Sequence, residues 1–252
     1  MSDKPYKAPA LEKGIAIIEL LARSPVPLSM MEIGDALSRS KHELYRMLIS
    51  LEDLNWLVRV RNEKFQLTNR LFDIAMSTPP RRNLHQAALD VMQELSNSVF
   101  QSCHLAVASD NDVVVVGRIE SPTLLGFSVR LGHRRPVTGS TSGRVLYGCA
   151  TEELKDAWRP SLKRRCDRAT FESFLADSEH VRKSGVLTMS AEFVQGVTDM
   201  SVPLYDRENG APAAALTLPY LKSGYAKISL EETRSLLVKA GKTISQKLTY
   251  GE

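Results

Sequence analysis

Residues 29–43 read Ser-Met-Met-Glu-Ile-Gly-Asp-Ala-Leu-Ser-Arg-Ser-Lys-His-Glu, and this stretch decides the fold of the N-terminal part of the chain. It contains two capping boxes, Ser29–Glu32 and Ser40–Glu43. In a capping box the serine hydroxyl accepts from the backbone N–H three residues later, and the glutamate reaches back to the serine N–H. The boxes predict a short helix ending near residue 37 and then a second helix, a spacing typical of a helix-turn-helix. The apolar side of the second helix consists of Leu44, Met47, Leu48, Leu51 and Leu54.

The segments on either side complete a winged helix-turn-helix. Residues 10–22 place apolar side chains at helical spacing, and the prolines of residues 23–27 end that helix. After the second capped helix, residues 56–60 and 65–67 are predicted as two strands, joined into a hairpin by the polar turn of residues 61–64. Three short helices followed by such a hairpin predict a DNA-binding domain over residues 1–78.

The second capped helix and the hairpin carry the candidate DNA contacts. Residues 39–70 hold seven basic side chains against four acidic ones, which suits contacts to phosphate. An ordinary solvated helix face and a soluble loop are the alternative interpretations, because a mixed-charge surface has the same composition. We expect double-stranded DNA to contact Ser40, Lys41, His42, Tyr45 and Arg46 on the helix, and Arg59, Arg61 and Lys64 on the hairpin.

A second domain with a different pattern follows the proline-containing boundary Thr78–Arg82. We expect a linker helix within residues 79–100, its apolar face running from residue 83 to residue 98, and then an α+β domain of antiparallel strands and helices over residues 101–252. The two last strands are joined by the turn Asp206–Gly210. The predicted strands are 103–108, 113–119, 124–131, 186–189, 197–204 and 211–221, and the predicted helices are 142–149, 152–158, 170–183 and 230–248.

Composition excludes several classes of protein. The net charge of +4 is too small to indicate nucleic-acid binding by itself. No apolar run approaches the roughly 18 residues of a membrane span. Residues 1–7 lack the apolar core of a signal peptide, so we expect the cytoplasm. Three widely spaced cysteines give neither a disulfide framework nor a metal site, and we expect inert thiols and no cofactor; they are Cys103, Cys149 and Cys166.

An enzyme is the main alternative to a binding protein. Residues 139–143 read Gly-Ser-Thr-Ser-Gly, which superficially resembles a nucleophile elbow, but the central residue is threonine and no clear buried strand precedes it. Nothing in the sequence orders the available histidines, His104, His133 and His180, into a triad, and no phosphate-binding loop or dinucleotide fingerprint is present. We therefore expect no enzymatic activity. The small residues at this helix start suit an anion instead. The basic run of residues 159–165 is interpreted as a solvated loop.

Several of these segments together resemble the IclR family of transcriptional regulators. Residues 11–19 resemble the opening helix of that family, and Lys41 and Arg46 stand where it carries lysine and arginine on the recognition helix. Residues 136–146 resemble its P-x-H-x-x-x-x-G-K-x-L segment, with Thr138 in the histidine position. Its C-terminal signature is matched by residues 185–192, Gly196 and residues 202–206. The resemblance implies a dimer or tetramer that binds a palindromic operator as a repressor or an activator and responds to a small-molecule effector.

The resemblance also places an effector pocket between the sheet and the loop of residues 139–143. Where relatives that bind small oxoacids have an acidic residue, a thiol and a hydroxyl, this chain has Met189, Asp199 and Pro219. We therefore expect an organic acid with a sizeable apolar or aromatic body. A neutral or cationic aromatic compound paired with Asp199 is the second candidate, and core filling by Met189 with loop capping by Asp199 is the alternative without a ligand. The expected wall consists of Leu124, Phe127, Thr141, Ser142, Met189, Asp199 and Thr217.

Two further expectations concern DNA reading and assembly. At the start of the recognition helix, His42 and Glu43 replace the small hydroxyl residues of many family members. A glutamate there would repel phosphate but could accept from a cytosine amino group. The helices of residues 10–22 and 83–98 both carry apolar surface beyond the needs of a small domain. We expect this surface to serve self-association.

Overall fold

The computed structural model describes residues 8–77, 79–190, 194–206, 210–222 and 227–250. The segment 1–7, Thr78 of the predicted boundary, Glu192 of the signature region and residues 207–209 of the predicted turn lie outside these ranges. The chain forms two compact units, Met1–Arg82 and Asn83–Glu252. No helix in the described ranges is both long and apolar enough to cross a membrane.

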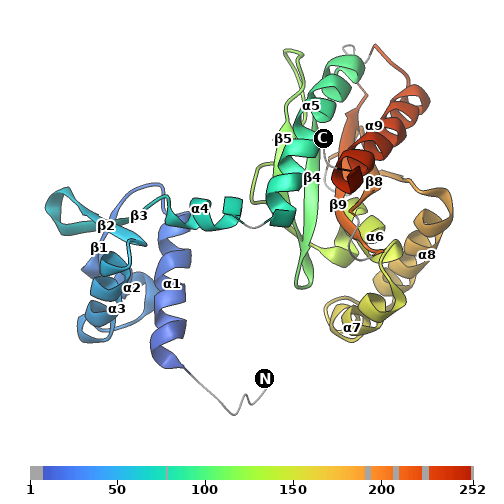
Figure 1. The fold of residues 1–252 in the computed structure, drawn as a ribbon. Helices are drawn as coiled ribbons and strands as arrows, with labels where there is room; N and C mark the ends of the chain where they lie inside the picture. Colours follow the sequence, from blue (N-terminus) through green and yellow to red (C-terminus); the bar gives the residue numbers. More distant parts are fainter. Residues whose placement is uncertain (1–7, 78, 191–193, 207–209, 223–226, 251–252) are drawn as a thin grey trace. The chain divides into compact units, whose positions relative to one another are not determined.

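The first unit is the predicted winged helix-turn-helix (Figure 1). Both capping boxes form, with the Ser29 and Ser40 side chains accepting from the backbone of Glu32 and Glu43. The predicted hairpin gains a third strand, because Leu28 and the capping residue Ser29 pair with the second strand of the hairpin, giving the order β1-β3-β2. The elements are α1 (Pro9–Arg23), β1 (Leu28–Ser29), α2 (Met30–Leu37), α3 (Lys41–Asp53), β2 (Leu57–Val60), the 3-10 turn η1 (Arg61–Glu63), β3 (Lys64–Leu67) and α4 (Arg70–Ser77).

A small core holds these elements together. The predicted apolar face of α3 is buried at Leu44 and Leu48 but not at Leu54, which follows the helix as its C-cap and is exposed. Helix α4 was not predicted from the sequence. The buried core residues of this unit are Ile17, Leu21, Ile33, Leu44, Leu48, Leu57 and Phe65.

The second unit is built on a six-stranded antiparallel sheet with the order β6-β5-β4-β9-β8-β7. Helices cover both faces of this sheet. Its elements are α5 (Pro79–Val99, which begins in the first unit), β4 (Cys103–Ser109), β5 (Asp112–Ile119), β6 (Arg134–Pro136), η2 (Val137–Gly139), α6 (Thr141–Gly148), α7 (Glu152–Lys163), α8 (Arg168–Ser184), β7 (Leu187–Ser190), β8 (Val197–Tyr205), β9 (Pro212–Leu221) and α9 (Leu230–Tyr250).

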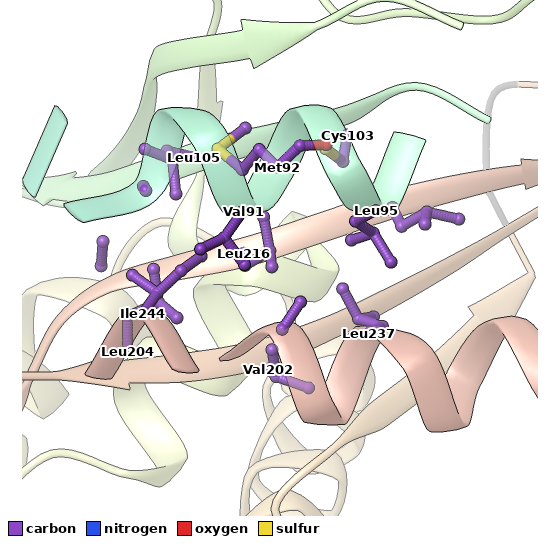
Figure 2. Packing of buried hydrophobic residues seen from close by; sticks show 14 of the residues in the cluster. Val91, Met92, Leu95, Cys103, Leu105, Val202, Leu204, Leu216, Leu237 and Ile244 are labelled. Carbon is purple, nitrogen blue, oxygen red and sulfur yellow. The ribbon is translucent and has the colours of Figure 1, made fainter. Parts of the chain in front are cut away.

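Helices α5 and α9 cover one face of the sheet (Figure 2). Val91, Met92 and Leu95 of α5 pack against strand residues such as Leu216 and against Leu237 of α9, so that all of them are buried. Burying such side chains contributes about 1.5–3 kcal/mol each. The predicted linker helix is therefore part of the core of the second unit. The expectation that its apolar face is free for self-association is corrected, since this core already covers it.

Helices α6, α7 and α8 cover the other face of the sheet. Their core includes Tyr147 of α6 and Phe174 of α8, whose ring centroids lie 4.8 Å apart. Because side chains alternate across a strand, β4 directs Leu105 to the α5/α9 face and His104 to the α6 face. A cavity remains between α6 and the strands on this face.

The structure corrects two further predictions in this unit. Residues 124–131 form no strand, although a short strand, β6, pairs with β5 a few residues later. Just before this segment, the Ser121 and Thr123 hydroxyls donate to the Phe100 and Leu125 carbonyl oxygens, and such side-chain bonds to the backbone compete with strand pairing. The basic run 159–165 is also not a loop throughout, since α7 extends to Lys163 and includes Pro160.

Candidate DNA-binding surface and effector pocket

The predicted DNA contacts of α3 lie on its exposed side. Lys41, His42, Tyr45 and Arg46 are exposed, with 53% of Tyr45 accessible, and none of them has an ion pair within the described residues. Ser40 is also exposed, but its hydroxyl caps the helix by accepting from the Glu43 N–H at 3.4 Å. Helix α3 thus presents two cations and two planar rings side by side, in a form that suits a DNA groove.

The glutamate at the start of α3 has a structural role. Glu43 accepts from the Ser40 N–H at 3.1 Å, while its other oxygen accepts from Lys13 of α1 at 2.8 Å. The Lys13 ammonium, followed by the bonds from Ser40, lowers the pKa of Glu43 to about 2. This carboxylate is therefore occupied by α1 and by its own helix. We no longer expect it to accept from a cytosine.

The three predicted contacts of the hairpin differ from one another. Arg59 is held by Glu52, at 2.9 Å, and by Glu63, and its guanidinium lies 5.1 Å from the centroid of the Phe65 ring. Lys64 donates to Glu32 at 3.3 Å. Arg61 at the tip is exposed and has no ion pair among the described residues. Of the three, Arg61 is the side chain most available to phosphate.

A cavity of about 530 Å³ lies between the sheet and the start of α6. Six of the seven predicted wall residues line it. The exception is Leu124, which is 96% exposed and lies outside the cavity because its segment is a loop and not a strand. The predicted residues that line the cavity are Phe127, Thr141, Ser142, Met189, Asp199 and Thr217.

Sheet register explains why residues distant in sequence meet in this cavity. Met189 of β7 and Asp199 of β8 are directly paired across neighbouring strands. Thr217 of β9 is paired with Ser201 on one side and His104 on the other. Side chains of paired residues lie on the same face of a sheet, which brings this group together opposite α6.

The close approach of α6 to the preceding η2 turn depends on a glycine. A Cβ atom on Gly143 would lie 2.1 Å from the carbonyl oxygen of Val137 and 2.7 Å from the Ser140 Oγ. Ser140 caps the helix by accepting from the Gly143 N–H at 3.1 Å. The resulting tight turn leaves the N–H groups of Thr141 and Ser142 at the helix start, where anions are favoured.

Burial changes the acid–base behaviour of two groups in the cavity. Desolvation raises the pKa of Asp199 to about 6, although a bond from Thr141 and the charge of Arg135 act against this shift. Burial, together with the nearby His133, lowers the pKa of His104 to about 4. His104 is therefore neutral at neutral pH, whereas Asp199 loses its proton near pH 6.

Sequence reasoning missed most of the charged side chains of the cavity. His104 and His133 were considered as bases but were not placed together, and both line the cavity, while His180 is exposed on α8. No local pattern marks these residues as neighbours, because strand register and loop path bring them together. The missed arginines are Arg130, Arg135 and Arg144. Among the described residues, no group of three or more potential ligands could hold a metal ion.

The winged helix-turn-helix and the pocketed α+β domain define a transcriptional regulator with a ligand-binding domain. Residues 10–61 match the family described as IclR helix-turn-helix domain, and residues 77–246 match the one described as bacterial transcriptional regulator IclR C-terminal. The chain belongs to the IclR family. It is a DNA-binding transcriptional regulator with an effector-binding C-terminal domain.

Individual relatives agree with this assignment over nearly the whole chain. The HTH-type transcriptional regulator KdgR of Escherichia coli is 24% identical, covering 99% of this chain and 96% of its own. An IclR homolog from Microbacterium hydrocarbonoxydans, solved with 4-hydroxybenzoate, superposes with a TM-score of 0.78 at 21% identity, covering 95% of this chain and 98% of its own. HmgR of Pseudomonas aeruginosa superposes with a TM-score of 0.73 at 20% identity, covering 96% and 100%. At these identities the two structures support the fold.

Proposed function

We propose that the cavity binds an organic acid with a sizeable apolar or aromatic body, and that its occupancy controls binding to a palindromic operator. The observation that carries this proposal is the cavity itself, whose apolar wall includes Val113, Val115, Phe127 and Met189. A volume of about 530 Å³ suits a ligand larger than a two- or three-carbon acid. The 4-hydroxybenzoate bound by the Microbacterium relative is a ligand of this kind.

The polar groups of the cavity suggest how such a ligand is oriented. The backbone N–H groups of Thr141 and Ser142 have no acceptor within the described residues and suit a carboxylate. Asp199 is the one carboxyl group among the described lining residues, and it suits a hydroxyl or an amine at the other end of the ligand. The second candidate, a neutral or cationic aromatic compound, is supported by Asp199 alone.

Titration calorimetry of the full chain tests the ligand class. We expect 4-hydroxybenzoate to bind, and Asp199→Ala to weaken it about ten- to a hundredfold, because a hydrogen bond to a charged group is worth about 1.5–3 kcal/mol. Benzoate, which lacks the hydroxyl, is the matched control and should lose little.

Three results would contradict parts of this proposal. Equal binding of 4-hydroxybenzoate to the wild type and to Asp199→Ala would show that Asp199 does not contact the ligand. Tight binding of glyoxylate or pyruvate rejects a large ligand. A preference for 4-hydroxybenzyl alcohol or tyramine over every aromatic acid selects the second candidate.

We propose that the protein acts as a homodimer or homotetramer. Helix α1 supports this, since Leu11 and Ile15 on its surface are 63% and 48% exposed. One recognition helix covers only a few base pairs, and a dimer presents two half-sites. Light scattering at micromolar concentration should give at least twice the chain mass. A monomer that binds DNA as one chain per site would reject the proposal.

We also propose that the cavity binds its ligand without chemical reaction, and that the protein acts in the cytoplasm. Thr141, the central residue of the elbow-like segment, bonds to Asp199. Within the described residues no hydrogen bond joins it to a histidine, the partner that an activated hydroxyl requires. The DNA contacts proposed for this protein are those of α3 together with the tip of the hairpin.

A further inference from the structure

A buried arginine lines the cavity beside the start of α6. The side chain of Arg144 is only 4% exposed, and its Nε donates to Asp177 of α8 at 3.0 Å. A guanidinium carries five N–H donors. No other partner of this guanidinium is present in the described part of the chain. Among the described residues only Ser178 Oγ is a fully buried side-chain polar atom without a partner, so the terminal nitrogens of Arg144 keep some access to solvent while the residue forms part of the cavity wall.

An oxyanion is a suitable partner for these nitrogens. Little of the Arg144 side chain is exposed, and a hydrogen bond between two charged groups is stronger than one between neutral groups. The Asp177 carboxylate, which is 30% exposed at its side chain, compensates one side of the guanidinium. The other side suits an oxyanion, which can accept two parallel N–H bonds from an arginine.

Arg144 lies in the first turn of α6, two to three residues after the free amides. Long side chains in an α-helix lean back toward the helix N-terminus and cover the preceding turn. In α6 the preceding turn contains Thr141 and Ser142, whose N–H groups also lack acceptors within the described residues. The guanidinium and the helix start are therefore neighbours along α6, and both line the cavity.

We propose that Arg144 and the Thr141 and Ser142 amides form a single anion subsite that takes the carboxylate of the effector. This inference rests on the proposed function and deepens it, since it assigns the two ends of the ligand: the carboxylate to Arg144, and the hydroxyl or amine to Asp199. The ligand class is then an aromatic acid with a hydrogen-bond donor remote from its carboxylate. Asp177 holds the guanidinium in place without touching the ligand and is a positioning residue.

Calorimetry with a pair of nearly isosteric probes tests the subsite. 4-Hydroxybenzoate and 4-hydroxybenzamide differ in charge at one end, so the ratio of their affinities reports the anion contact within one protein. We expect Arg144→Gln to lower this acid-over-amide ratio about tenfold to a hundredfold and to leave amide binding nearly unchanged. Arg144→Lys keeps the positive charge but loses the planar set of N–H donors, and it should lower the ratio by less than Arg144→Gln does.

Controls separate this role from a structural one. Arg182→Gln removes another arginine that pairs with a carboxylate of α8, Glu179, but lies outside the cavity wall, and it should leave the ratio unchanged. Asp177→Asn keeps the guanidinium and should retain a preference for the acid. Melting temperatures identify any variant that does not fold. If Arg144→Gln does not fold, the test uses Arg144→Lys instead.

Each outcome decides the inference. An unchanged ratio in both Arg144 variants overturns the subsite, while acid binding to the wild-type chain keeps the proposed function. Equal loss of acid and amide assigns Arg144 to the packing of α6 on α8 and also overturns it. If the wild-type chain binds neither probe, the subsite is rejected together with the aromatic-acid proposal.

Discussion

Replacing Arg46 by alanine is expected to weaken operator binding about ten- to a hundredfold. The guanidinium is exposed on α3 and has no ion pair among the described residues, so it is free to make charge-assisted bonds to DNA. A bidentate contact to a guanine is worth about 1–3 kcal/mol, and its loss also relaxes the preference for that base pair. Fluorescence anisotropy measures the effect on a duplex selected from a random library by the wild-type protein.

Salt dependence distinguishes the kinds of contact that Arg46 can make. If it contacts a phosphate, binding falls by the same factor on every sequence, and the slope of log affinity against log salt decreases by about 1. Arg168→Ala, which removes an exposed arginine of the second unit, is the control and should change neither quantity. Unchanged affinity and unchanged salt slope for Arg46→Ala would remove this residue from the DNA surface.

Gly143→Ala is expected to destabilise the second unit by about 3 kcal/mol or more, because overpacking against a rigid neighbour reaches this range. The added Cβ would lie 2.1 Å from a backbone oxygen, so helix α6 would have to move. For a domain of this size such a loss lowers the melting temperature by about 6–12 °C. Thermal unfolding followed by circular dichroism measures it.

A neighbouring glycine provides the stability control for this variant. A Cβ on Gly139 would meet nothing closer than 3.8 Å, which is ordinary contact, so Gly139→Ala should melt within about 2 °C of the wild type. If Gly143→Ala melts like Gly139→Ala, the turn from Val137 into α6 is adaptable and the glycine is not required there.

Local signals in the sequence predicted the first unit well. A capping box specifies a helix start within four residues, and both boxes form as expected, so α2 and α3 were predicted nearly to the residue. What the sequence could not provide was the pairing of its charges. Arg59 and Lys64 were assigned to DNA, but Glu52 and Glu32, which approach only in the folded chain, hold them.

The pocket shows the same division between local and long-range information. The resemblance placed Thr141, Met189 and Asp199 correctly on the cavity wall, because each could be matched to a position of the family. The resemblance also placed Leu124 on the wall, and this was wrong: residues 124–131 were predicted as a strand but form a loop, preceded by side-chain hydrogen bonds of Ser121 and Thr123 that no sequence pattern reveals. Arg144 was missed as a wall residue, since its partner lies 33 residues away on another helix.

The contact between Lys13 and Glu43 means that positions on the recognition helix are under different kinds of selection, some for folding and others for DNA recognition. Glu43 joins α1 to the start of α3, so mutations there are constrained by the folding of the whole domain. The neighbouring residues His42, Tyr45 and Arg46 are exposed and are not constrained in this way by the folding of the domain. During evolution, substitutions at these three positions can change which promoters are recognised while the anchored helix stays in place. New regulatory targets can then be acquired by single mutations, because each mutant protein still folds.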